Sequence, residues 1–105
     1  MTDALVVLLT FPTEDAAAQI GRTLVEERLL ACANLVPAIR SIYRWQGAIH
    51  DERETLVLGK TTRAKLDALQ ARLPQLHPYD TPELLALPVE AGLERYLGWV
   101  RESVA

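Results

Sequence analysis

The segment HPYDTPE, residues 77–83, places an imidazole, a phenol and two carboxylates within seven positions. The imidazole and carboxylates, together with the thiol of the single cysteine, Cys32, form a donor set that suits zinc or copper. The candidate ligands in the segment are His77, Asp80 and Glu83. Their spacing matches none of the compact metal-binding motifs, such as H-E-x-x-H or C-x-x-C, so spacing alone does not identify a metal site.

His77 and Cys32 each have a structural alternative to metal binding. His77 lies at the end of a predicted helix, where an imidazole can bond a carbonyl or face the helix dipole, and spacing alone favours this role. Cys32 lies in an apolar predicted strand, which favours a buried and inert thiol. No glycine-rich turn or helix start follows Cys32 to supply an oxyanion hole, and the five glycines never cluster into a phosphate loop. We therefore expect a protein that is not an enzyme.

Length, composition and charge narrow the possible functions. The 105 residues suffice for one domain, spanning residues 1–105, and an apolar fraction of 50% is typical of a folded globular chain. A net charge of −3 offers little attraction to nucleic acid or anionic lipid. The first apolar run is too short to span a membrane, and a lone cysteine suits a reducing compartment. We expect a cytoplasmic protein with neither a nucleic-acid nor a membrane partner.

Apolar residues at helical spacing predict three helices. Thr13 can cap the first, which is expected to run to about Arg28. The second is predicted by leucines at positions 66, 69, 73 and 76. Pro74 is expected to kink or stop it near Arg72, with a short extra turn beyond. The third helix is predicted over residues 93–103.

Strands are predicted before, between and after these helices. The continuous apolar run Ala4–Phe11 predicts a buried strand, and residues 31–45 and 54–60 predict the two arms of a hairpin. Residues 83–89 predict a last strand. The order β-α-β-β-α-β with an appended helix predicts an α+β, ferredoxin-like sandwich, in which two helices cover one face of a four-stranded antiparallel sheet.

The predicted hairpin is too long for its own sheet. Fifteen extended residues span roughly 50 Å at about 3.3 Å each, whereas a compact chain of this size has a radius of gyration near ~13 Å. Pro37 is expected to mark a bend or bulge, because proline cannot donate within a central ladder. The projecting part carries apolar residues: Ile39, Ile42, Tyr43, Trp45 and Ile49. This surface favours packing against another copy of the chain, the alternative being a shorter strand that is coiled after Pro37.

Four separated motifs resemble the CutA divalent-cation-tolerance family. They are ERLLACANLVPAIRSIYRWQGAIHDERE, the end of the hairpin at Lys60–Thr61, HPYDTPE and ALPVEAGLERYLGWV, in this order and over nearly the whole chain. The family's usual form of the third motif is H-P-Y-E-x-P-E, so Asp80 shortens one possible ligand by a methylene. Pro74 inside the second helix is the other departure.

The resemblance implies a ferredoxin-like homotrimer in which the long hairpins wrap around neighbouring subunits. It also implies a part in tolerance to copper and other divalent cations, with copper as the ion that some members bind. The metal-ligand candidates that it carries over are Cys32, His77 and Glu83. The residues that would line a cleft near a subunit boundary are Tyr43, Trp45, Glu54, Lys60 and Tyr79.

Three hypotheses for function follow. The first is a metal-binding or metal-responsive trimer. The second is a small-molecule-sensing or signalling trimer, in which Tyr79, Lys60 and Glu54 converge on an anionic or polar metabolite held between subunits. The third is a non-catalytic scaffold whose only activity is assembly.

Overall fold

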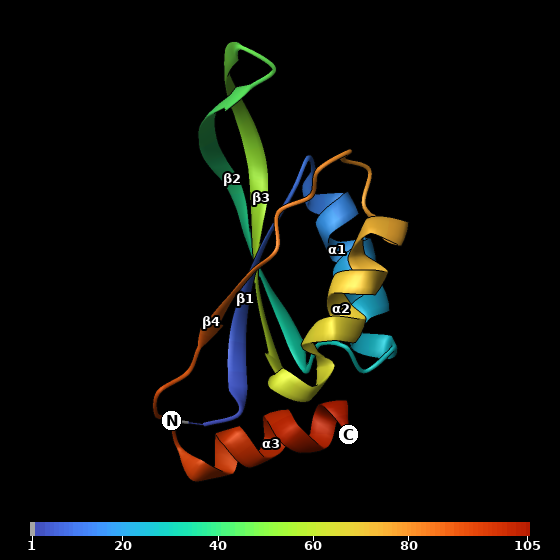
Figure 1. Cartoon of the computed structure of the whole chain (residues 1–105), viewed down its shortest axis with the longest axis vertical. Helices are drawn as coiled ribbons and strands as arrows, with labels where there is room; N and C mark the ends of the chain where they lie inside the picture. The colour runs from blue at the N-terminus through green and yellow to red at the C-terminus, as the bar shows by residue number, and fades with distance from the viewer. Residues whose placement is uncertain (1) are drawn as a thin grey trace.

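Four strands and three helices follow one another in the order that the sequence predicts. The computed structural model describes residues 2–105. Its elements are β1 (Ala4–Phe11), α1 (Glu14–Glu26), β2 (Cys32–Trp45), β3 (Ala48–Thr62), α2 (Arg63–Leu76), β4 (Leu85–Pro88) and α3 (Glu94–Val104). The strands form one antiparallel sheet in the order β2-β3-β1-β4. The predicted α+β, ferredoxin-like fold is therefore confirmed (Figure 1).

The hydrophobic core lies between one face of the sheet and the helices α1 and α2. Side chains of β1 alternate, so that Val7, Leu9 and Phe11 are buried against the helices while Leu8 and its even-numbered neighbours face the other way. Figure 1 shows both helices on the same side of the sheet. The side chain of Thr13 caps α1, as predicted, by accepting a hydrogen bond from the Ala16 N–H at 3.1 Å.

The sequence predicts a kink or a stop near Arg72, and the stop is wrong, because helix α2 continues through Pro74 to Leu76. Pro74 lacks the N–H that would donate to the carbonyl four residues earlier, so the helix loses one backbone hydrogen bond there, but only two residues follow the proline before the helix ends. The last turn is also held in place. Arg72 makes a two-point ion pair with Glu27, at 2.8 and 2.9 Å, and the His77 N–H donates to the Leu73 carbonyl at 2.9 Å.

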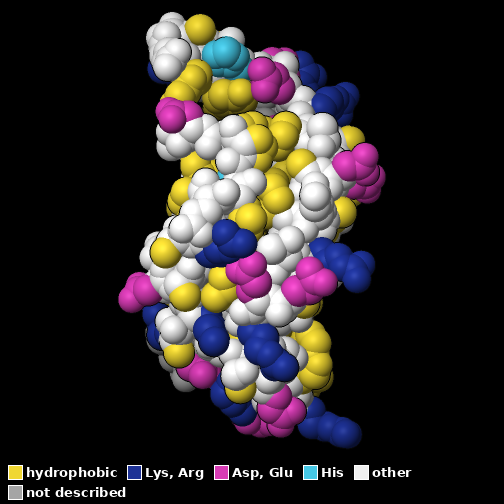
Figure 2. All heavy atoms as spheres, turned by 90° about the vertical axis from the view of Figure 1, so that its right-hand side faces the viewer, with side chains coloured by type: hydrophobic (Ala, Val, Ile, Leu, Met, Phe, Trp, Pro, Cys, Tyr) yellow, Lys and Arg dark blue, Asp and Glu magenta, His cyan; other side chains and the backbone are white. Residues whose placement is uncertain are grey.

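Strands β2 and β3 form a long hairpin that projects beyond the rest of the sheet (Figure 1). The return strand begins at Ala48, six residues earlier than predicted, and its pairing with β2 continues to the tip. The molecule accordingly measures 44 × 25 × 22 Å. On the helix side, hydrophobic side chains gather below the hairpin tip, whereas charged side chains are spread over the lower half (Figure 2).

The bulge expected at Pro37 is present, and it changes which side chains of β2 face the helices. Val36 pairs with Leu56, but the next pair is Ile39 with Glu54, so β2 carries one extra residue there. Ala38 has a φ of 59°, in the left-handed region. Because side chains alternate along a strand, the extra residue turns the odd-numbered side chains beyond it, including Tyr43, towards the face opposite the helices.

The face of the sheet opposite α1 and α2 is apolar and is left uncovered over most of its area by residues 2–105. We call it the open face; its members are Val6, Leu8, Val36, Leu56, Leu58, Leu85 and Leu87. Leu85 and Leu87 are 56% and 49% exposed. Helix α3 lies at the lower end of the sheet, away from the hairpin (Figure 1).

Candidate functional site

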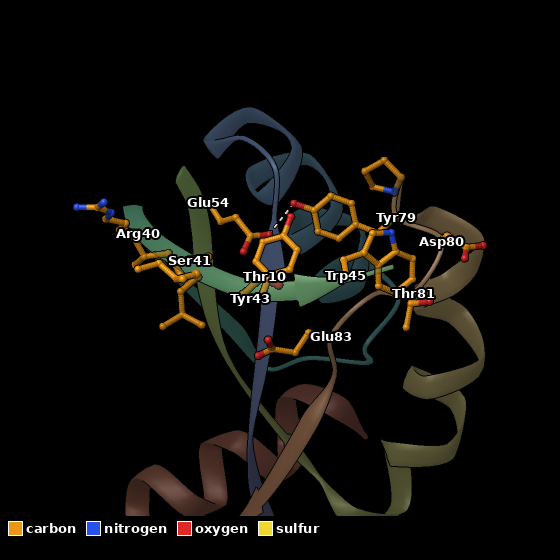
Figure 3. A pocket seen from close by; sticks show the side chains of 14 residues that line it. Thr10, Arg40, Ser41, Tyr43, Trp45, Glu54, Tyr79, Asp80, Thr81 and Glu83 are labelled. Carbon is orange, nitrogen blue, oxygen red and sulfur yellow. Dashed lines mark hydrogen bonds between the residues drawn. The ribbon is translucent and has the colours of Figure 1, made fainter. Parts of the chain in front are cut away.

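A cleft of about 770 Å³ lies at the upper end of the open face, where the hairpin leaves the sheet. Side chains from β1, β2, β3 and the segment between α2 and β4 line it (Figure 3). The lining includes four of the five residues predicted for a cleft, namely Tyr43, Trp45, Glu54 and Tyr79. It also includes Glu83, which the sequence proposed as a metal ligand.

His77 lies behind the cleft wall and holds the HPYDTPE segment against β1. Its side chain is only 7% exposed and stacks on Phe11, with ring centroids 4.6 Å apart. Nε2 lies 2.7 Å from the Thr10 carbonyl, which only accepts, and Nδ1 accepts the Tyr79 N–H at 3.1 Å. Both ring nitrogens therefore have a hydrogen-bond partner when the imidazole is neutral and carries its proton on Nε2. Burial lowers the pKa of His77 and favours this neutral form.

Tyr79 and Glu54 join the segment to strand β3. The Tyr79 hydroxyl donates to Glu54 Oε2 at 2.6 Å, and the Tyr79 ring packs at 4.7 Å, centroid to centroid, from His77. Burial and the Glu54 carboxylate raise the pKa of Tyr79, so the phenol stays protonated and remains a donor. His77, Tyr79 and Glu54 thus form a chain of contacts from the core to the cleft wall.

Glu83 is the second carboxylate of the cleft. It enters from the segment before β4, whereas Glu54 enters from β3 (Figure 3). Burial raises the pKa of Glu83, and the negative charge of Glu54 raises it further. Among the described residues Glu83 makes no hydrogen bond or ion pair, so none of them offsets its charge.

The polar groups of the hairpin are largely occupied with one another. The Tyr43 hydroxyl donates to Glu52 at 2.9 Å, and its ring stacks on His50 at 5.2 Å. Arg40 is the one Lys or Arg in the described cleft lining, and it makes a two-point ion pair with Asp51 at 2.8 and 2.6 Å. Its guanidinium group points away from the cleft (Figure 3), so the interior keeps an acidic character.

Cys32 and Lys60 lie at the other end of the open face. They pair directly across β2 and β3, with Lys60 in turn opposite Val6 of β1, whereas His77 contacts Thr10. Four residues along a strand separate the two levels by roughly 13 Å. Lys60 donates to Asn34, and Cys32 Sγ lies 3.8 Å from the Tyr96 hydroxyl. Lys60 is therefore not part of the cleft.

The predicted ligands Cys32, His77 and Glu83 are not brought together in one chain. Across residues 2–105, no three His, Cys, Asp or Glu side chains form a group that could hold a metal ion. His77 has no free ring nitrogen, and Asp80 points out of the cleft (Figure 3). The donors of a single chain thus do not fit a bound divalent ion.

Sequence reasoning missed that Glu83 and Glu54 line the same cleft, and it missed the contact of Cys32 with Tyr96. The first depends on the loop between α2 and β4 lying over β3, and the second depends on where α3 packs. One signal was available in the sequence. A bulge at Pro37 implies that Tyr43 and Trp45 share a face with Glu54, which alternation without the bulge would not give.

The chain matches one protein family over nearly its whole length. The sequence pattern of the family described as CutA1 divalent ion tolerance protein matches residues 5–103. A Thermus thermophilus protein named divalent-cation tolerance protein CutA is 50% identical over 98 residues, which cover 93% of this chain and 95% of that protein.

Solved structures of similar proteins agree in fold. A crystal structure of CutA from Xylella fastidiosa gives a TM-score of 0.95 at 39% identity and covers 99% of this chain and 100% of that chain. A structure of CutA from Archaeoglobus fulgidus, described as a periplasmic divalent cation tolerance protein, gives 0.93 at 32% identity, over 97% and 99%. The resemblance drawn from the four motifs is confirmed: the chain belongs to the CutA1 divalent ion tolerance protein family.

Proposed function

We propose that this chain acts as a non-catalytic homotrimer that takes part in tolerance to divalent cations. The observation that supports assembly is the open face, which presents leucine and valine side chains to water. Burying apolar surface contributes about 25 cal/mol per Å², so packing this face against another copy is favourable. The relatives' names supply the cation-tolerance role, and the trimer is the assembly that the family resemblance implies.

The hairpin adds a second apolar surface for assembly. Ile42 is 64% exposed near its tip, and Ile49 on the other arm is exposed as well. Strands β2 and β4 are the two edges of the sheet, and unpaired edges favour pairing with another chain. A hairpin that wraps around a neighbour would cover its own apolar residues and part of the neighbour's open face.

Binding of copper or a similar ion belongs to this proposal only in the assembled protein. Because residues 2–105 of one chain do not group three suitable donors, a bound ion would need donors from more than one subunit. Cys32 faces the same side of the sheet as the open face and is partly accessible. Its thiol, once deprotonated, is a soft donor of the kind that copper(I) and zinc favour.

Replacing Leu87 by Asp tests the assembly. In an isolated chain a half-exposed aspartate costs little, whereas at a subunit boundary it buries a charge without a partner. We expect light scattering to give the wild type three times the 11.7 kDa of one chain, and the variant a lower mass. The control is Ala71→Asp, on an exposed part of α2, which should leave the mass unchanged.

The wild type and a cysteine variant test whether the protein binds a divalent ion. Copper(II) should raise the melting temperature of the wild type in a saturable way, because a ligand that favours the native state stabilises it by mass action. Cys32→Ser should weaken that rise. A monomeric wild type would contradict the trimer, and a trimer whose melting temperature ignores copper(II) and zinc would contradict ion binding while leaving the assembly intact.

A small-molecule-sensing trimer is the second candidate, and the cleft is the observation that favours it. Its volume lies in the range of about 300–1,000 Å³ that is usual for small-molecule sites.

A cytoplasmic location is likewise proposed from the sequence. Along residues 2–105, no helix combines the length and apolar character needed to cross a membrane.

A further inference from the structure

The charge and lining of the cleft select one chemical class of ligand. We propose that the cleft binds a small organic cation, with an ammonium or guanidinium group held between Glu54 and Glu83 and an apolar body held against Tyr43, Trp45 and Tyr79. This inference goes beyond a part in cation tolerance. It does not require the trimer, because every residue that it uses belongs to one chain.

Glu54 and Glu83 supply the charge that would recognise the cation. Glu54 is only 9% exposed, and Tyr79 donates to its Oε2. No hydrogen bond from the described residues reaches Oε1 of Glu54 or either oxygen of Glu83. Two partly buried carboxylates that repel each other gain most from a positive charge placed between them.

The walls of the cleft suit the organic part of such a ligand. The rings of Tyr43, Trp45 and Tyr79 lie along it (Figure 3). The aliphatic side chains of Ile39 and Leu56 also line it. Aromatic faces attract cations and contribute roughly 0.5–2 kcal/mol where water is partly excluded. An ammonium or guanidinium group on an apolar body would use both the carboxylates and the rings.

Anions and bare metal ions fit this lining less well. Arg40 is the one basic side chain in the described lining, and it is already bound to Asp51 outside the cleft. The sequence-based hypothesis of an anionic metabolite relied on Lys60, which lies at the other end of the open face. Calcium and magnesium prefer six or more oxygen ligands, zinc and copper prefer a smaller set rich in nitrogen or sulfur, and the described residues offer no group of three suitable donors for either kind.

The cleft wall is also fixed before any ligand binds. His77 bonds the Tyr79 N–H and the Thr10 carbonyl at the same time, and Pro78 stiffens the backbone between them. The Tyr79 hydroxyl then fixes Glu54. A ligand therefore meets a preformed carboxylate and ring, and little ordering cost opposes binding.

Three probes that share a benzyl ring test the proposal by charge: benzylammonium, benzyl alcohol and benzoate. Titration of the intact protein at constant ionic strength, followed by NMR, should show saturable binding of benzylammonium that perturbs the Trp45 indole signal. Glu83→Gln should weaken it about tenfold or more, because a hydrogen bond to a charged group is lost. Glu54→Gln, which still accepts from Tyr79, should weaken it similarly. Glu90→Gln, exposed and outside the cleft, is the matched control.

Each outcome decides. Benzylammonium binding that is at least tenfold tighter than benzyl alcohol or benzoate, and is weakened about tenfold or more in both cleft variants but not in Glu90→Gln, supports the proposal. Benzyl alcohol binding as tightly, benzoate binding more tightly, or no effect of Glu83→Gln overturns it. Zinc chloride that occupies the cleft in preference to benzylammonium, with the same two variants abolishing its binding, also overturns it in favour of a metal site. Repeating the titration on Leu87→Asp separates this result from the failure or success of trimer assembly.

Discussion

The two faces of the sheet are built for different purposes. Towards α1 and α2, strand β1 presents Val7, Leu9 and Phe11, all fully buried within one apolar cluster. Towards the other side, the same strand presents Leu8 and Thr10 to the open face and the cleft. The helix side therefore supplies the stability of the single chain, whereas the open face is available for recognition. One strand carries both roles, because its side chains alternate.

Matched leucine truncations on the two faces give the largest expected contrast. Leu9→Ala removes a fully buried side chain and should lower the free energy of unfolding by about 2–5 kcal/mol. Leu85→Ala removes one that is more than half exposed and should cost less than about 1 kcal/mol in an isolated chain. Urea unfolding in a Leu87→Asp background, where assembly is weakened, measures both.

The two truncations can also contradict the proposed difference between the two faces of the sheet. Equal losses in that background would mean that the open face is buried within one chain, contrary to the exposure of Leu85. The same two truncations in a background with Leu87 intact should differ in another way. In the assembled protein Leu85→Ala should become more costly, because its side chain would lie at a subunit boundary, while the cost of Leu9→Ala should stay the same.

His77 connects the two faces, since it stacks on Phe11 of the core and bonds Tyr79 of the cleft wall. Burial holds its pKa below 6.5 in the folded protein. The unfolded chain therefore binds more protons between the folded pKa and 6.5, so the free energy of unfolding should fall as the pH drops through this range. Thermal unfolding from pH 7.5 to 5.5 measures the fall.

His77→Asn removes the titrating group while leaving an oxygen that can accept the Tyr79 N–H. The variant should be less stable than the wild type at neutral pH, because the Thr10 bond and the ring stacking are lost. Its free energy of unfolding should no longer show the fall with decreasing pH that His77 causes in the wild type. His50→Gln, in the exposed hairpin, is the comparison that keeps His77 intact. A slope that survives in His77→Asn would assign the acid sensitivity to other groups.

Much of the fold could be predicted because it depends on local patterns. The apolar run Ala4–Phe11 and the leucines of α2 identify a strand and a helix without knowledge of their neighbours. Pro37 marked the bulge correctly. Pro74 was misleading, because the end of α2 is held by Glu27, a residue 45 positions from Arg72 that no local pattern reveals.

The site could be predicted only in part, for a related reason. Periodicity places Glu54 and Lys60 on the same face of β3, and this is correct. The six residues between them, or roughly 20 Å of strand, already place Lys60 too far from Glu54 for one cleft, a distance that the prediction did not use. By contrast, nothing local indicates that Thr10 and Tyr79 engage both nitrogens of His77. Residue types predicted what chemistry was available, whereas tertiary contacts decided which groups were free to perform it.

Among the described residues, the helix side contains a buried polar group without a hydrogen-bond partner. Removing this group should give the smallest of the expected changes in stability. Thr61 is fully buried on that face of β3, and its hydroxyl has no hydrogen-bond partner within residues 2–105. Valine has nearly the same shape without the polar atom, so Thr61→Val should raise the free energy of unfolding by about 1 kcal/mol. The control is Thr23→Val on α1, which removes a hydroxyl that donates to the Gln19 carbonyl at 3.1 Å and should bring no gain. Equal effects of the two changes in urea unfolding would show that the buried hydroxyl of Thr61 finds a partner in solution, and the helix side would then have no unsatisfied polar group to distinguish it.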